Sequence, residues 1–158
     1  MPDIKYRNAN EKDATAISLL WGEYFDYHFS LDPSYKRNND SEKDIAEFLV
    51  KAVKDENIFI YLAEHDNKVV GYIWCEIDKK PPCFQNRLYG LVSDIAVTKE
   101  QRGKGIAKKL LKQGMEWFKT KNISHVEARV LQSNPLATKF WQASGFDPFV
   151  QILRHKLT

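Results

Sequence analysis

The segment of residues 91–111 constrains the possible folds of this chain more than any other part of the sequence. An apolar run ends at Val97, two glycines follow in the sequence Arg102-Gly103-Lys104-Gly105, and an amphipathic pattern then begins. This order predicts a strand, a tight turn and a helix. Glycines allow the backbone to approach a ligand closely, and the free N–H groups of a first helical turn favour an anion. The segment therefore predicts either an anion-binding loop or a turn whose glycines only relieve backbone strain.

This loop matches neither of two well-known phosphate-binding loops. The Walker loop requires Gly-Lys followed by Ser or Thr, whereas Lys104 is followed by Gly105. The Rossmann fingerprint requires a third glycine and a strand that opens a βαβ unit, and both are missing here.

The remaining patterns alternate between helix and strand along the chain. Apolar side chains recur at helical spacing after Asn10 and after Ser41. A short helix is expected from Asn134 to Gly145, since Asn caps helix N-termini and Gly follows their C-termini. Runs rich in β-branched and aromatic residues predict strands over residues 4–7, 58–63, 69–77, 88–97, 125–130 and 151–157. The order β-α-α-β-β-β-α-β-α-β predicts an α/β or α+β fold with one sheet flanked by helices.

Length and composition limit the class of protein. The chain has 158 residues, of which 43% are hydrophobic and 28% charged, so a single domain over residues 1–158 is expected. The net charge of +3 is too small to require a nucleic acid but suits a small anion. The two cysteines exclude a disulfide framework or a Cys-based zinc cluster, and no apolar stretch is long enough to span a membrane. We therefore expect a cytoplasmic protein that uses no metal, nucleic acid or membrane.

Two motifs resemble the signatures of the GNAT superfamily of acyl-CoA-dependent N-acyltransferases. The loop resembles its Arg/Gln-x-x-Gly-x-Gly/Ala signature, and residues 134–146 resemble its Asn-x-x-Ala-x-x-Phe-Tyr-x-x-x-Gly-Phe signature. The order of elements also agrees, so the resemblance covers nearly the whole chain. It implies a mixed, mostly antiparallel sheet and an enzyme that transfers acetyl from acetyl-CoA to a primary amine by direct attack.

The resemblance also implies which residues bind acetyl-CoA. The pyrophosphate is expected on the backbone amides of Arg102, Gly103, Lys104, Gly105, Ile106 and Ala107. The thioester arm is expected along Ile95, Ala96 and Val97, where a backbone N–H would polarise the thioester carbonyl. Asn134 matches the asparagine that contacts this arm, although an Asn before a Pro is also an ordinary helix cap.

Trp141 stands where this family often has a tyrosine that protonates the leaving thiolate. An indole N–H cannot act as that acid, so the role is vacant or filled by another group. Trp141 is expected to pack against the coenzyme A arm or in the core beside Phe140 and Phe146. The alternative function is therefore a catalytically weak module that binds acyl-CoA as a sensor.

A carboxylate is expected to accept the proton of the incoming amine. Glu127 is the first candidate for this catalytic base and Asp94 the second, with Glu76 as a further carboxylate on a neighbouring strand. The resemblance places the acceptor beside the first two helices, where aromatic and acidic residues favour a cationic amine. A small-molecule amine and a protein N-terminus both stay open as acceptors, and a homodimer is possible because relatives often form one.

Overall fold

The structure is a computed structural model that describes residues 3–157. Within these residues a five-stranded sheet has the order β1-β2-β3-β4-β5. Its strands are β1 (Lys5–Asn8), β2 (Ile58–His65), β3 (Lys68–Lys79), β4 (Leu88–Val97) and β5 (Val126–Ala128). The first four strands are antiparallel to their neighbours, and β5 pairs parallel to β4. This arrangement confirms the mixed, mostly antiparallel sheet.

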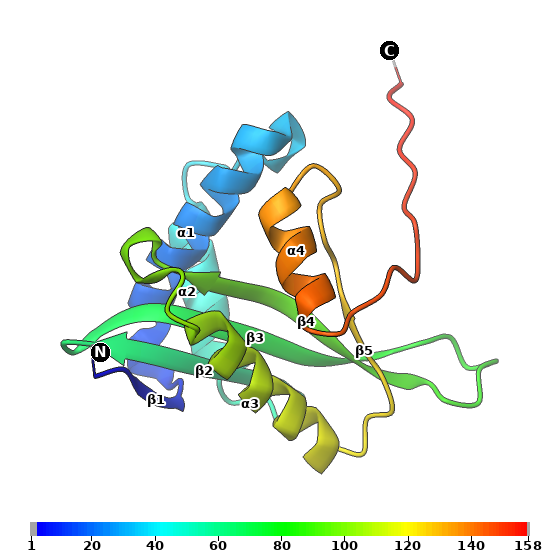
Figure 1. Cartoon of the computed structure of the whole chain (residues 1–158), viewed down its shortest axis with the longest axis horizontal. Coiled ribbons are helices and arrows are strands. Elements are labelled where there is room, and N and C mark those ends of the chain that lie inside the picture. Colours follow the sequence, from blue (N-terminus) through cyan, green and yellow to red (C-terminus); the bar gives the residue numbers. More distant parts are fainter. Residues whose placement is uncertain (1–2, 158) are drawn as a thin grey trace.

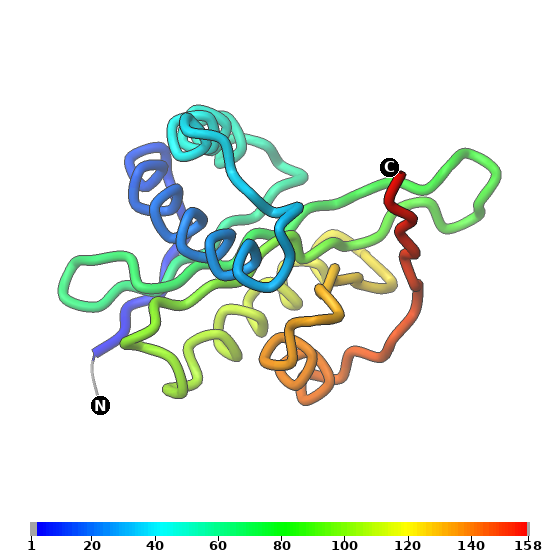
Figure 2. The backbone as a smooth tube through the Cα atoms, turned by 90° about the horizontal axis from the view of Figure 1, so that it is seen from above, coloured from blue at the N-terminus to red at the C-terminus, as the bar shows by residue number. Residues whose placement is uncertain are grey.

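Helices cover both faces of this sheet (Figure 1). The α-helices are α1 (Ala14–Leu31), α2 (Ser41–Ala52), α3 (Ile106–Thr120) and α4 (Pro135–Ala143), and the short 3-10 turns are η1 (Glu11–Asp13), η2 (Pro33–Tyr35) and η3 (Lys99–Gln101). Figure 2 shows α1 and α2 on one side of the sheet and α3 and α4 on the other.

The core has two parts because successive side chains of β3 point to opposite faces. Tyr72 and Trp74 are buried against α1 and α2, whereas Ile73 and Cys75 are buried against α3. The same alternation places Asp94, the partner of Trp74 in the ladder, on the face covered by α1.

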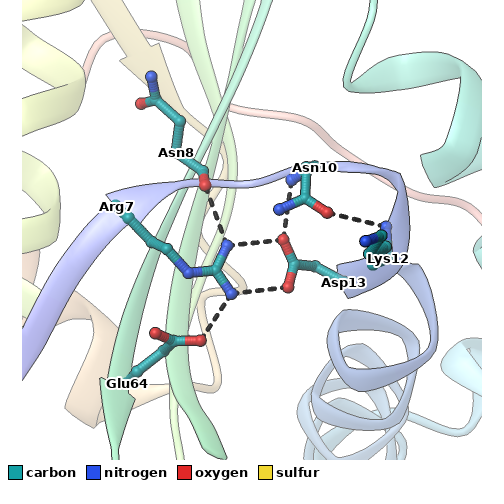
Figure 3. Close-up of polar contacts among 6 residues, drawn as sticks. All are labelled: Arg7, Asn8, Asn10, Lys12, Asp13 and Glu64. Carbon is teal, nitrogen blue, oxygen red and sulfur yellow. Dashed lines mark hydrogen bonds and ion pairs between the residues drawn. The ribbon is translucent and has the colours of Figure 1, made fainter. Parts of the chain in front are cut away.

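A network around Arg7 joins β1, η1 and β2 (Figure 3). The Arg7 guanidinium donates two hydrogen bonds of 2.8 Å to the Asp13 carboxylate and one of 2.6 Å to Glu64. The Asn10 backbone N–H donates to the same carboxylate at 2.8 Å. The hydrogen bonds from Arg7 lower the pKa of Asp13 below its ordinary value. The network therefore stabilises the start of α1 while Asp13 is ionised, and this contribution falls as the pH drops through the lowered pKa.

The predicted strand over residues 151–157 is wrong, because these residues form no strand in the structure. The C-terminal segment, defined here as residues 147–157, extends away from α4 (Figure 1). Its Arg154 donates hydrogen bonds to the Asp32 carboxylate and, at 3.0 Å, to the Ser34 hydroxyl, just after the end of α1. Strand propensity reflects packing against neighbouring strands, and within residues 3–157 the backbone of this segment pairs with no strand.

We expect Gly90→Ala to destabilise the protein by about 1–3 kcal/mol, because overpacking a core forces side chains from their rotamers. A Cβ on Gly90 would lie 2.7–2.9 Å from three ring atoms of Phe118, which is buried on α3. Denaturant unfolding measures the loss. The double variant Gly90→Ala with Phe118→Leu should lose less free energy of unfolding than the two single variants lose in sum. Additive losses would contradict the proposed clash between the new Cβ and the Phe118 ring.

Candidate active site

A β-bulge in β4 lies in the wall of a cavity at the end of this strand. Trp74 pairs with Asp94 and Cys75 with Val92, so Ser93 is an extra residue on β4. β5 pairs with β4 only over Gly90–Val92 within residues 3–157. Beyond the bulge the two strands separate, with α4 beside the gap (Figure 1). The backbone of β4 after the bulge is therefore left without a neighbouring strand on that side.

The cavity has a volume of about 230 Å³ and lies between β4, α4 and α1. The end of β4 contributes Ile95, Ala96 and Val97, and the loop contributes Arg102 and Ala107. Side chains of α1 and α4 form opposite walls: Leu20, Glu23, Tyr24, Tyr27 and His28 from α1, and Leu136, Ala137, Phe140 and Trp141 from α4.

The glycine loop presents free backbone N–H groups at one end of this cavity. Gly103 and Gly105 both have φ of +76°, a left-handed conformation that glycine adopts most readily. α3 begins directly after Gly105, and its first backbone bond runs from the Lys109 N–H to the Gly105 carbonyl, at 3.1 Å. The N–H groups of residues 106–108 are consequently not used within the helix. This geometry can bind an anion.

The basic side chains of the loop form hydrogen bonds within the protein. The Arg102 Nε–H donates to the Val97 carbonyl at 3.0 Å, which attaches the loop to the end of β4. Lys104 donates to the Glu100 carbonyl at 3.1 Å and to Gln101 Oε1 at 2.8 Å. Of the six predicted loop residues, Arg102 and Ala107 line the cavity, whereas Ile106 is buried in the core beneath it. The expected pyrophosphate site is therefore made mainly of backbone atoms.

Asn134 and Trp141 both serve the architecture of α4 and line the cavity. Asn134 is buried and accepts a hydrogen bond of 3.1 Å from the Ala137 N–H, as a helix cap. Trp141 is also buried, with ring centroids 5.2 Å from Phe140 and 4.7 Å from Phe146. Asn134 can therefore cap α4 and still contact a ligand in the cavity, and Trp141 can pack in the core and still contact the same ligand.

Asp94 is a buried carboxylate on the cavity wall. Burial, with a smaller contribution from the charge of Glu76, raises the pKa of Asp94 to about 7. Burial and the nearby Asp94 charge also raise the pKa values of Tyr24 on α1 and Tyr72 on β3. Asp94 and Tyr24 both line the cavity, whereas Tyr72 lies in the core outside its lining. An acid with a pKa near neutral on the cavity wall can exchange a proton with a ligand.

Glu127 lies elsewhere on the sheet. It pairs with Leu91 across β4 and β5, and its carboxylate is 3.4 Å from His125 Nε2. It is not among the residues that line the cavity in the described part of the chain. Glu76 accepts a hydrogen bond of 2.5 Å from the hydroxyl of Ser93 at the bulge. Of the two base candidates, only Asp94 is brought to the cavity.

Sequence reasoning missed Tyr72 and Trp74. The Tyr72 hydroxyl and the Trp74 indole N–H are buried and lack a hydrogen-bond partner within residues 3–157. Their alternation with Ile73 and Cys75 was the available signal, since it places two polar-tipped rings on the same face as Glu76. Buried polar atoms without a partner are uncommon in folded proteins.

Known proteins similar to this chain include acetyltransferases. The model of the acetyltransferase (GNAT) family matches residues 16–146. An uncharacterised N-acetyltransferase of Archaeoglobus fulgidus is 28% identical over 87% of this chain and 89% of its own length. An N-alpha-acetyltransferase of Sulfurisphaera tokodaii is 33% identical over 68% of this chain and 67% of its own length.

Solved structures share the fold at lower sequence identity. A mutant of the BH1408 protein from Bacillus halodurans has a TM-score of 0.87 and 21% identity, covering 98% of this chain and 99% of that one. A predicted acetyltransferase with acetyl-CoA from Clostridium acetobutylicum has a TM-score of 0.79 and 18% identity, covering 98% and 96%.

No helix within residues 3–157 is both long and apolar enough to cross a membrane. The same residues contain no group of three or more His, Cys, Asp or Glu side chains arranged to hold a metal ion.

Proposed function

The chain belongs to the GNAT acetyltransferase family, and from this premise we propose that it acetylates a primary amine by direct attack of the amine on acetyl-CoA. Acetyl-CoA is the co-substrate of this family. The observation that carries the proposal is one cavity in which an anion-binding loop, an unpaired stretch of β4 and the buried carboxylate of Asp94 meet.

The proposed position of acetyl-CoA follows from these three features. The pyrophosphate binds the backbone amides of the loop at the start of α3. The thioester arm extends along Ile95, Ala96 and Val97, where β4 has no neighbouring strand, between Asn134 and Trp141. A free N–H of this stretch polarises the thioester carbonyl and stabilises its developing negative charge.

Asp94 is the proposed base. The amine nitrogen attacks the thioester carbon, the carbon–sulfur bond breaks, and Asp94 takes the proton that the nitrogen loses. A pKa of about 7 suits this role because about half of the carboxylate is ionised at neutral pH, and this form is basic enough to accept a proton. Glu127 is the less suitable base, since its carboxylate faces His125 outside the cavity lining.

The acceptor is proposed to be a cationic amine at the α1 end of the cavity. Glu23 and Asp94 supply negative charge there, and Tyr24, Tyr27 and His28 supply rings that can contact a cation. The Sulfurisphaera relative is named for acetylation of α-amines, which supports a protein N-terminus as one acceptor to test.

Thiol release from acetyl-CoA tests the function. The purified chain is mixed with a panel of amino-terminal peptides, polyamines, amino sugars and amino acids, and thiol and acetylated product are both measured. Stoichiometric thiol and acetyl-amine with at least one acceptor would support the proposal. If calorimetry shows that coenzyme A binds but no amine causes thiol release, the result would instead support the acyl-CoA sensor. The tryptophan at position 141 favours this alternative, because it has no phenol to protonate the leaving thiolate.

We also propose a homodimer through the C-terminal segment. Five large apolar side chains of this segment are 72–84% exposed: Phe149, Val150, Ile152, Leu153 and Leu157. Proteins rarely expose such a continuous apolar surface without a partner, and a second copy offers the outer edge of β5, which pairs with no further strand within residues 3–157. Ile152→Lys should weaken dimerisation at least tenfold in sedimentation velocity.

The control for this variant is Phe84→Lys, which changes an exposed apolar residue in the β3–β4 connection. It should leave the sedimentation coefficient unchanged. A wild-type chain that sediments as a monomer at high concentration would contradict the homodimer.

A further inference from the structure

Resting on the proposed function, the geometry points to Tyr24 of α1 as the group that protonates the leaving thiolate. The α4 wall cannot supply this proton, because its cavity-lining side chains are Leu136, Ala137, Phe140 and Trp141. Three of these have no polar hydrogen, and the indole N–H of the fourth is not acidic enough. A side chain that supplies this proton therefore has to lie on another wall of the same cavity.

Most of the other polar side chains on the cavity wall cannot donate a proton to the thiolate, because they are too weakly acidic or already form another hydrogen bond. Arg102 and Arg129 stay protonated at any working pH. The Ser93 hydroxyl donates to Glu76, and the Nδ1–H of His28 donates to the Tyr24 carbonyl at 2.8 Å. Asp94 holds the proton taken from the amine. The phenols of Tyr24 and Tyr27 are the neutral O–H donors that remain among the lining residues.

Tyr24 is the better placed of these two phenols. It lies across the cavity from α4 and is close enough to Asp94 for that carboxylate to raise the pKa of its hydroxyl, after the larger effect of burial. The shift keeps the phenol protonated throughout the working range of pH. Its ring is fixed by His28, at 4.3 Å between centroids, and by Phe25, at 5.0 Å.

Proton transfer then balances within the cavity. As the carbon–sulfur bond breaks, its electron pair goes to sulfur, which takes the proton of the Tyr24 hydroxyl. The resulting phenolate regains a proton from Asp94, which had received one from the amine. Because burial raises the pKa of the phenol above that of an ordinary thiol, the two transfers occur together. The net direction is favourable, since the proton passes from Asp94, whose pKa is about 7, to the more basic thiolate. The net change moves one proton from the amine to the thiol of coenzyme A and restores both residues.

The surroundings of Asp94 are consistent with such a relay. The charge of Asp94 raises the pKa values of Tyr24 on α1 and Tyr72 on β3, and the charge of Glu76 on β3 contributes to the raised pKa of Asp94. The Tyr72 hydroxyl is fully buried without a partner within residues 3–157, so it is available to bond Asp94 or a water beside it. We therefore assign Tyr72 to positioning Asp94. Tyr24, in contrast, lines the cavity in which the substrate is proposed to bind.

The test compares Tyr24→Phe with Tyr61→Phe, which removes one hydroxyl from a half-buried tyrosine of β2 outside the cavity lining. Single-turnover acetyl transfer at saturating acetyl-CoA and amine should slow about 10²-fold or more for Tyr24→Phe. The acetyl-CoA affinity and the melting temperature should stay at wild-type values, and the rise in rate near pH 7 assigned to Asp94 should persist. Tyr61→Phe should change the rate less than threefold.

A second variant restores a phenol from the opposite wall. Trp141→Tyr in the Tyr24→Phe background should recover at least tenfold in rate, since Trp141 lines the same cavity. A Tyr24→Phe rate within threefold of wild type would overturn the assignment. A slow Tyr24→Phe that also loses acetyl-CoA affinity or stability, and gains nothing from Trp141→Tyr, would assign Tyr24 to packing. A wild-type chain without turnover on any amine would instead overturn the proposed function itself.

Discussion

Asp94→Asn is expected to lower the rate of acetyl transfer about 10²–10⁴-fold, the usual contribution of a positioned general base. Asn has nearly the same shape but cannot accept the amine proton. Asp94 lines the cavity, so this loss should appear in the chemical step, with the affinity for acetyl-CoA within about twofold of wild type. Single-turnover kinetics and calorimetry measure the two quantities separately.

The rate of acetyl transfer should increase with pH as Asp94 loses its proton. Only ionised Asp94 can accept a proton, so the wild-type rate should rise with pH and reach half its maximum near the pKa of about 7. Asp94→Asn should remove this rise. Glu127→Gln is the matched control, because it neutralises a carboxylate on the neighbouring strand outside the cavity lining. If Glu127→Gln removes the rise and Asp94→Asn keeps it, the base is Glu127.

The same shift has a consequence for stability. Asp94 has its pKa raised by folding, so its contribution to stability is full below its unfolded pKa, at pH of about 4, and is lost as the pH rises through about 7. Asp94→Asn should therefore gain free energy of unfolding relative to wild type over this interval, and the gain should level off at higher pH. Denaturant unfolding at pH 4, 6 and 8 checks this dependence.

Gly105→Ala is expected to weaken coenzyme A binding about 10–100-fold. Gly105 has φ of +76°, and a Cβ there would meet no atom of residues 3–157 within 4 Å, so it would point into open space beside the free amides of α3. The added methyl group would occupy room that the pyrophosphate needs, and the left-handed backbone would resist a side chain.

Gly145 provides a closely matched control. It has φ of +84°, a Cβ on it would also meet nothing described within 4 Å, and it lies just after the end of α4 outside the cavity lining. Gly105→Ala and Gly145→Ala should each cost about 1–2 kcal/mol of stability. Only Gly105→Ala should lose affinity in calorimetry. If both variants bind coenzyme A with the affinity of the wild type, the loop does not bind the pyrophosphate.

The short helix near the C-terminus was predictable from its ends. Asn134 caps α4 through its side chain, as expected for an Asn before a Pro. After α4, the Gly145 N–H donates to the Gln142 carbonyl and the Phe146 N–H to the Trp141 carbonyl, which is the Schellman arrangement that a C-terminal glycine allows. These contacts connect residues within six positions of one another, so local sequence contains their cause.

The order of the two base candidates could not be predicted in this way. Glu127 and Asp94 are both carboxylates on strands, and only the register of β3, β4 and β5 distinguishes their surroundings. The bulge at Ser93 sets which face Asp94 occupies, and the packing of α1 then buries it. The shift in its pKa comes from that burial, so no local pattern could contain it.

The sequence by itself determined the elements whose causes are local: the glycine loop between β4 and α3, the capped helix α4, and the alternation that divides the core between two faces of the sheet. Tertiary structure alone decided the separation of β4 from β5, the presence of both Tyr24 and Asp94 in the lining of one cavity, and the absence of a strand over residues 151–157. The physical reason is that hydrogen-bonded turns and caps form between near neighbours in the chain, whereas strand pairing and burial depend on residues far away in the sequence.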